Sequence, residues 1–196
     1  DSSIGENGGA GIRVGRALGV RLDEVKVFGN QKQGIRIDST NVYFNEIEVK
    51  ANIQHALNLG LMTTGTISES YFGEGLGSVL DSVGNIHIEN NFFERTLIGL
   101  DVNNSNADIF GNRFINNSIG LKVNGSSLPN TIKGNVFSGN SIAVENLTDK
   151  TLSIKENYWG ELDSLEILGL MNGPVDFANF LKVDPYSEAV ALDSIV

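Results

Sequence analysis

The sequence repeats with a period of about 22 residues, and this repeat constrains the fold more than any other feature. One apolar position recurs through seven repeats, as a first ladder: Leu22, Phe44, Ile67, Ile88, Ile109, Ile132 and Ile154. A second ladder follows five residues later in each repeat: Val27, Val49, Phe72, Phe93, Phe114, Phe137 and Trp159. A third ladder precedes the first by about ten residues: Ile12, Ile35, Leu57, Val79, Leu100, Leu121 and Val144. Three ladders in one register indicate a solenoid in which each repeat is one turn.

Short strands with one buried side fill each repeat. Segments such as Gly99-Leu100-Asp101-Val102 and Gly120-Leu121-Lys122-Val123 alternate between apolar and polar residues, as half-buried β-strands do. Gly, Asn and Ser separate these segments, and no helical period is sustained before about residue 160. We therefore predict an all-β fold in which residues 1–160 form a parallel β-helix of about seven coils.

A leucine-rich repeat is the alternative solenoid, because its period is similar. It requires a Leu-x-x-Leu-x-Leu-x-x-Asn core and a helix or 3₁₀ segment in many repeats. This chain has Ile, Val and Phe at the ladder positions and no room for a helix in each repeat, so the parallel β-helix is favoured.

The repeat also has irregular positions. Asp81 and Asn146 fall where the third ladder expects a second apolar residue, so we expect a bulge or a register change at both rungs. Ile4 aligns 23 residues before Val27, which makes the first coil incomplete. We expect further coils or another domain to precede Asp1.

Asparagines recur at two corners of the repeat. One set lies two residues before the second ladder: Asn91, Asn112, Asn135 and Asn157. The other set follows the same strand, with interruptions at Gly75 and Thr96: Asn30, Asn52, Asn117 and Asn140. Stacked amides hydrogen-bond from rung to rung, and Asn tolerates the left-handed backbone of tight corners. We therefore interpret these residues as structural.

Composition excludes several functional classes. With 14 Lys+Arg against 24 Asp+Glu, the net charge of −10 repels phosphate backbones, so we predict no nucleic-acid binding. Long anionic glycans are disfavoured for the same reason unless a metal ion bridges them. The absence of Cys excludes disulfides and thiolate metal sites, and no apolar run reaches the ~20 residues of a membrane span. We predict no cofactor; calcium is compatible with the acidic surface, but no motif supports it.

A nine-residue motif carries a family resemblance. Ile-x-x-Asn-x-Phe-x-x-Asn occurs from Ile109 to Asn117 and again from Ile132 to Asn140. It resembles the parallel β-helix repeat of the pectate-lyase-like superfamily, above all that of bacterial and archaeal surface proteins and of a periplasmic family involved in copper-enzyme maturation. The resemblance covers about residues 4 to 160. It implies a right-handed, single-stranded β-helix and an extracellular or cell-surface location, with the periplasm as second choice.

The tail strengthens this resemblance. Asn157-Tyr158-Trp159-Gly160 closes the last coil, and residues 161–196 are expected to form a helix-plus-strand cap and a tail. Asp163 to Met171 would be the helix, with Asp163 or Ser164 as N-cap and Gly173 as its stop. Such a cap would cover the exposed edge that ends a β-helix.

Any chemistry must lie at the outward positions between the ladders. Beside the third ladder these positions are Arg13, Arg36, Asn58, Leu80, Asp101, Lys122 and Glu145. Asp101, Lys122 and Glu145 form an alternating-charge column, which is typical of a solvated face. The alternative is a saccharide groove whose two carboxylates would lie ~10 Å apart, at or beyond the range of inverting hydrolases.

The other outward columns supply two more candidates. His87 and Asp108 lie on adjacent rungs and could act as a base with its orienting group, although a surface His beside an Asp is common without activity. The other histidine, His55, lies at a corner, so no metal site is predicted. Tyr71 and Phe92 form an exposed aromatic strip that Arg113 flanks. Such a strip fits a ligand-binding site for sugar faces or a partner, and equally a surface covered by a loop or another domain.

Two functions remain open. The chain lacks the Arg-x-Pro-x-x-Arg, Asp-Asp with Gly-His-Gly, and Asp-Pro-His motifs of pectate lyases, polygalacturonases and alginate epimerases. We therefore favour a non-catalytic structural or adhesive module of a secreted or cell-surface protein, with a polysaccharide or another protein domain as partner. The alternative is a polysaccharide lyase or glycoside hydrolase acting from the outer face.

Overall fold

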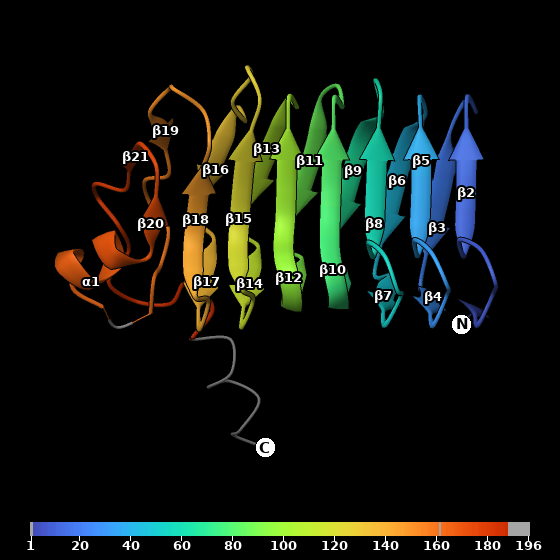
Figure 1. The fold of residues 1–196 in the computed structure, drawn as a ribbon, viewed down its shortest axis with the longest axis horizontal. Helices are drawn as coiled ribbons and strands as arrows, with labels where there is room; N and C mark the ends of the chain where they lie inside the picture. The colour runs from blue at the N-terminus through green and yellow to red at the C-terminus, as the bar shows by residue number, and fades with distance from the viewer. Residues whose placement is uncertain (1, 161, 188–196) are drawn as a thin grey trace.

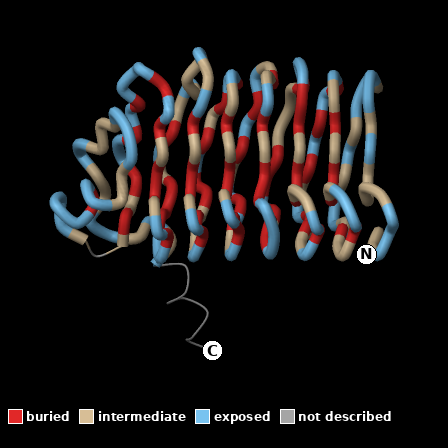
Figure 2. The backbone as a smooth tube through the Cα atoms, viewed as in Figure 1, coloured by how far each residue is buried: buried red, intermediate tan, exposed pale blue. Residues whose placement is uncertain are grey.

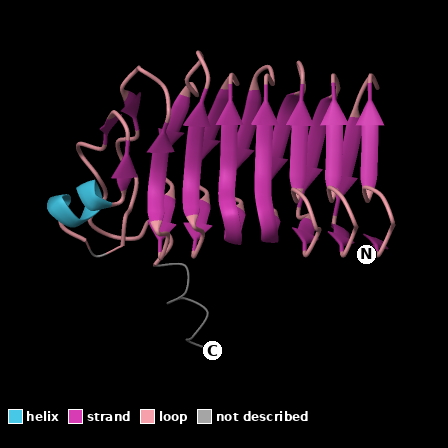
Figure 3. Ribbon diagram, in the orientation of Figure 1, coloured by secondary structure: helices cyan, strands magenta, loops and turns pink. Residues whose placement is uncertain are grey.

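A computed structural model describes residues 2–160 and 162–187. The chain winds into a parallel β-solenoid of about eight turns, whose strands lie side by side along the long axis (Figure 1). Within the described residues the one helix is α1 (Ser164–Gly169), at the C-terminal end of the stack (Figure 3). The leucine-rich repeat alternative is thereby excluded. The predicted tail residues 188–196 lie outside the described residues.

Three faces of stacked strands form the solenoid. Face 1 contains β2 (Ile12–Gly15), β5 (Ile35–Asp38), β8 (Leu57–Gly60), the second half of β10 (Tyr71–Asp81), the second half of β12 (Phe92–Asn103), β15 (Ile119–Asn124), β18 (Ile142–Asn146) and β20 (Met171–Asn172). Face 2 contains β3 (Val20–Asp23), β6 (Asn41–Asn45), β9 (Thr64–Ser68), β11 (Ile86–Glu89), β13 (Ala107–Phe110) and β16 (Thr131–Lys133), continued by the pair β19 (Leu152–Ser153) and β21 (Val175–Asp176). Face 3 contains β1 (Ser2–Gly5), β4 (Val25–Phe28), β7 (Glu48–Lys50), the first halves of β10 and β12, β14 (Arg113–Ile115) and β17 (Val136–Ser138).

The predicted first and second ladders are confirmed as the core. Phe44 pairs with Leu22 and Ile67 in one register, and the pairing continues rung by rung to Ile132. The second ladder stacks its rings: the centroids from Phe72 to Trp159 are 4.6–5.3 Å apart, with interplanar angles of 8–17°. Buried residues run through the stack from Val27 on, whereas the first turn has only half-buried and exposed residues (Figure 2). Each rung therefore hides its apolar side against its neighbours.

The asparagine corners are also confirmed. Asn112 Oδ1 accepts from Asn91 Nδ2 at 3.0 Å, and Asn112 Nδ2 donates to Asn135 Oδ1 at 3.0 Å. At the other corner Thr96 takes the place of an asparagine, since its hydroxyl donates to Asn117 Oδ1 at 2.7 Å. The residue before each of these corner asparagines has positive φ, for example 56° at Asn90, which precedes Asn91. This left-handed residue turns the chain, and the amide ladder satisfies the backbone at the turn.

The third ladder differs from the prediction at one rung. Ser78, not Val79, pairs with Leu57 and Leu100, because the register between β10 and β12 shifts after Gly77: Gly77 pairs with Ile98, and Ser78 pairs with Leu100. Ser78 and Leu80 therefore point inward, and Val79 replaces Leu80 in the outward column. The register change expected at the rung of Asp81 is thus confirmed. It lies at Gly77 and Ser78, while Asp81 itself pairs in register with Asn103 and is exposed.

The expected bulge at Asn146 is wrong. Asn146 pairs with Val123 in register and points inward at the apolar position, 2% exposed. Its Nδ2 donates to the carbonyls of Lys150 and Pro174 at 2.8 and 2.7 Å, and its Oδ1 accepts from Thr148. A polar residue fits the core here because the following loop and the cap supply all its partners.

The C-terminal segment forms a last turn and a cap. Asp163 is the N-cap of α1 and forms a capping box with Glu166. The helix ends at Gly169, earlier than predicted, because Met171 and Asn172 pair with β18. β21 pairs with β19, and Leu181 bridges to Tyr158. The last rung is therefore covered on all three faces.

Candidate functional site

The predicted aromatic strip lies on face 3. Tyr71 pairs with Glu48 on one side and Phe92 on the other, and Phe92 pairs with Arg113. The alternation of β10 and β12 turns these side chains outward while Phe72 and Phe93 enter the core. Phe92 is 45% exposed, and Tyr71 is partly exposed. The sequence therefore placed these three residues on successive rungs correctly.

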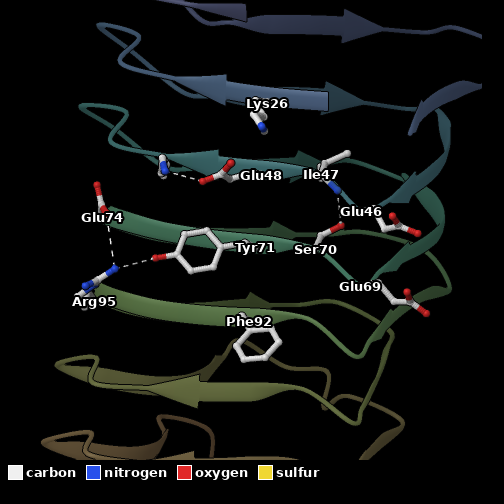
Figure 4. Close-up of a pocket in the computed structure, with 11 residues that line it drawn as sticks. Lys26, Glu46, Ile47, Glu48, Glu69, Ser70, Tyr71, Glu74, Phe92 and Arg95 are labelled. Atoms are coloured by element: carbon white, nitrogen blue, oxygen red, sulfur yellow. Dashed lines mark hydrogen bonds and ion pairs between the residues drawn. The ribbon is translucent and has the colours of Figure 1, made fainter. Parts of the chain in front are cut away.

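A groove of about 540 Å³ surrounds Tyr71 (Figure 4). Phe92 lines it from the next rung, and Lys26, Glu48, Glu74 and Arg95 are among the charged residues around it. The Tyr71 hydroxyl donates to Glu94 Oε2 at 3.2 Å and accepts from Arg95 Nη2 at 3.4 Å. These contacts hold the phenol ring in place across the groove.

Ion pairs surround the tyrosine. Arg95 lies 3.7 Å from Glu74 and 3.6 Å from Glu94, and Lys50 pairs with Glu48. The hydrogen bond to Glu48 raises the pKa of Lys50. The sequence interpretation missed Arg95 and Glu94, although strand alternation places Glu94 outward two residues after Phe92.

A second groove, of about 570 Å³, begins on the other side of Phe92. Arg113 lines it, with its Nη2 3.3 Å from Asp184 Oδ2 and its guanidinium 5.4 Å from the centroid of the Tyr186 ring. The Tyr186 hydroxyl donates to the carbonyl of Gly111 at 2.7 Å, and burial raises its pKa. The Arg113 side chain is only 27% exposed. The end of the strip at Arg113 is therefore bound to the C-terminal segment, while Tyr71 and Phe92 stay open.

The predicted charge column lies on face 1. Asp101 pairs in register with Lys122, and Lys122 with Glu145. Lys122 Nζ is 3.7 Å from Glu145 Oε2, and Asn172 Nδ2 donates to Glu145 Oε1 at 2.8 Å. Glu145 is thus held by two neighbours, Lys122 and Asn172, whereas Asp101 has a different environment.

Asp101 has an environment unlike the others. Its Oδ1 is buried without a hydrogen-bond partner among the described residues, and burial raises its pKa against the opposing effect of Lys122. His55 also interacts electrostatically with Asp101; its Nδ1 has no described partner, and burial lowers its pKa. Shifts of this kind are found at functional sites and in structural charge networks alike. His55 lies two residues before Leu57, the first residue of β8 on face 1. This spacing in the sequence could have placed His55 beside face 1.

His87 and Asp108 pair on adjacent rungs of face 2, as predicted. His87 Nδ1 lies 3.4 Å from Asp108 Oδ2. The imidazole is half exposed and lines neither groove beside Phe92.

The described residues offer neither a metal site nor a membrane-spanning helix. Across residues 2–160 and 162–187, no group of three or more His, Asp or Glu side chains has an arrangement that could hold a metal ion. No helix in the described part of the chain has the length and apolar character that crossing a bilayer requires.

The chain matches one family of known proteins. Comparisons with curated proteins and with solved structures gave no significant match. The family model for the right-handed β-helix region matches residues 1–158. That match covers the parallel turns from β1 to β19, and the chain belongs to the right-handed β-helix family.

Proposed function

We propose that this chain is a non-catalytic β-helix module of a secreted or cell-surface protein that binds carbohydrate through Tyr71 and Phe92. The observation that carries the proposal is the open aromatic pair on adjacent rungs, with a groove on each side of Phe92. The continuous core supports the structural part of the proposal, since stacked rungs make a rigid scaffold.

The chemistry of the strip suits a neutral saccharide. Flat aromatic rings pack against the apolar C–H faces of sugar rings, while hydroxyls of the sugar find polar partners at the edge. Glu48, Glu74 and Arg95 supply acceptors and donors of this kind around Tyr71. Two rings on successive rungs, ~4.8 Å apart, would contact successive units of a chain rather than one isolated sugar.

The test is binding of Tyr71→Ala/Phe92→Ala to a panel of neutral polysaccharides by affinity electrophoresis and calorimetry. We expect affinity to fall about tenfold or more, because an exposed aromatic anchor carries much of the contact energy. The matched control is Tyr43→Ala/Phe110→Ala, which removes two aromatics of similar exposure, 40% and 46%, from face 2. Equal loss in both variants, or no loss in the first, would contradict the proposal.

A lyase or hydrolase is the second candidate, and the environment of Asp101 favours it. A carboxyl whose pKa is raised by burial, beside Lys122, resembles a general acid or base. On that hypothesis the wild type would release products from a polysaccharide, and Asp101→Asn would release none. Both proteins would still bind the polysaccharide through the aromatic strip. On the favoured proposal neither protein forms products.

A further inference from the structure

A third groove lies over the first turns, at the corner that leads into face 1. It measures about 430 Å³ and is lined by Arg13, Lys32, Arg36, Gln33 and Gln54, together with small residues. It shares no lining residue with the two grooves beside Phe92. The groove brings three of the chain's 14 cationic side chains together, and no carboxylate lines it.

The cations in this groove are poorly neutralised by the protein. Arg13 and Arg36 are direct neighbours in register on β2 and β5, and like charges in that position repel each other. Arg36 Nε lies 3.4 Å from Asp38 Oδ2, whereas no salt bridge found among the described residues involves Arg13 or Lys32. The pair Arg13 and Arg36 therefore has one nearby carboxylate for two guanidinium groups, and such unbalanced charge in a fold is typical of a site that a ligand completes.

The backbone around the groove is fixed. The Lys32 N–H donates to the Gly9 carbonyl at 3.2 Å, and the Gln54 N–H donates to the Lys32 carbonyl at 3.2 Å. Main-chain groups are thus used within the stack, and the side chains of Gln33 and Gln54 remain to offer amide donors beside the guanidinium groups. Fixed strands hold Arg13 and Arg36 one rung apart.

We propose that this groove binds a sulfate or phosphate group, either as a free ion or as an ester on a glycan. Guanidinium groups bind such oxyanions through paired, charge-assisted hydrogen bonds, and Lys32 adds a third positive charge. The net charge of −10 does not prevent this, because remote carboxylates are screened beyond about 8 Å at physiological ionic strength. The sequence argument against anionic ligands therefore holds for the surface as a whole and not for this groove.

The test is calorimetric titration of the whole chain with inorganic sulfate and inorganic phosphate at fixed ionic strength. We expect saturable binding that Arg13→Gln/Arg36→Gln weakens by about tenfold or more, since two charge-assisted contacts are lost. The matched control is Arg16→Gln/Arg21→Gln, which removes the same charge from exposed residues outside the groove. Circular dichroism and thermal unfolding check that all variants stay folded.

The outcomes are distinct. Loss of binding in Arg13→Gln/Arg36→Gln alone supports the site, whereas no saturable binding, or equal loss in the control, overturns it. Titration with a sulfated polysaccharide and with its desulfated form then distinguishes an ester on a glycan from a free ion as the ligand. Much tighter binding of the sulfated polymer than of free sulfate assigns the ester, and similar affinity assigns the free ion. Because Tyr71→Ala/Phe92→Ala leaves this groove intact, the result is independent of the carbohydrate proposal.

Discussion

At the scale of single residues, buried amides hold the corners of the stack. Asn112 is fully buried, and its Oδ1 accepts from the backbone N–H and the Nδ2 of Asn91, both at 3.0 Å. Its Nδ2 donates to the Ile88 carbonyl at 2.8 Å. The sequence repeat predicted these amide ladders because each side-chain amide hydrogen-bonds to the asparagine at the same position of the next rung.

Removing one such amide should be costly. We expect Asn112→Ala to lower the free energy of unfolding by about 3 kcal/mol, because it leaves buried groups of Asn91 and Ile88 without partners. The control is Asn58→Ala at an outward position of β8. This control should change the free energy of unfolding by about 0.5 kcal/mol or less. Urea denaturation measures both, and equal effects would contradict the structural role of the ladder.

Asp101 should make stability depend on pH. Burial raises its pKa above the ordinary 3.8, so the folded chain keeps this proton to a higher pH than the unfolded chain. As pH rises from 3.8 through the raised pKa, the fold loses stability, and the loss is complete above it. Asp101→Asn has no such titration, so its stability relative to the wild type should increase between about pH 3.5 and pH 7. Urea denaturation across that range measures the difference, and a constant difference would refute the inference.

At the scale of elements, strand β10 shows where sequence periodicity fails. The repeat predicted Val79 as a core residue, but the register shift between Gly77 and Ser78 moves Leu80 inward instead. Both registers place an apolar residue inside, so alternation alone could not choose between them. The helix end was misjudged for a related reason: Met171 and Asn172 prefer pairing with β18 to a further helical turn.

The register shift depends on one glycine. Gly77 has φ of 101°, and a Cβ there would collide with the Ile98 carbonyl oxygen. We expect Gly77→Ala to destabilise the protein by about 2 kcal/mol or more. Gly15→Ala is the control, because a Cβ at Gly15 meets open space. A fall in melting temperature of similar size in both variants would contradict the requirement for glycine at position 77.

At the scale of the whole molecule, the sequence predicted the solenoid better than the sites. Ladders repeat locally, so residues 22 apart identify each other. The partners of Arg113, by contrast, are Asp184 and Tyr186, which reach it only after the chain has completed its last turns. His55 beside Asp101 and the cations Arg13 and Lys32 at one corner also depend on how rungs stack, not on any motif.

The aromatic face is the main functional claim for the whole molecule. The most direct measurement incubates the wild-type chain with a neutral polysaccharide that it retains, and follows bound protein and release of unsaturated or reducing ends in the same sample. We expect retention without products, and loss of retention in Tyr71→Ala/Phe92→Ala. Products that accumulate with the wild type and vanish with Asp101→Asn would contradict the claim and identify face 1 as a catalytic surface.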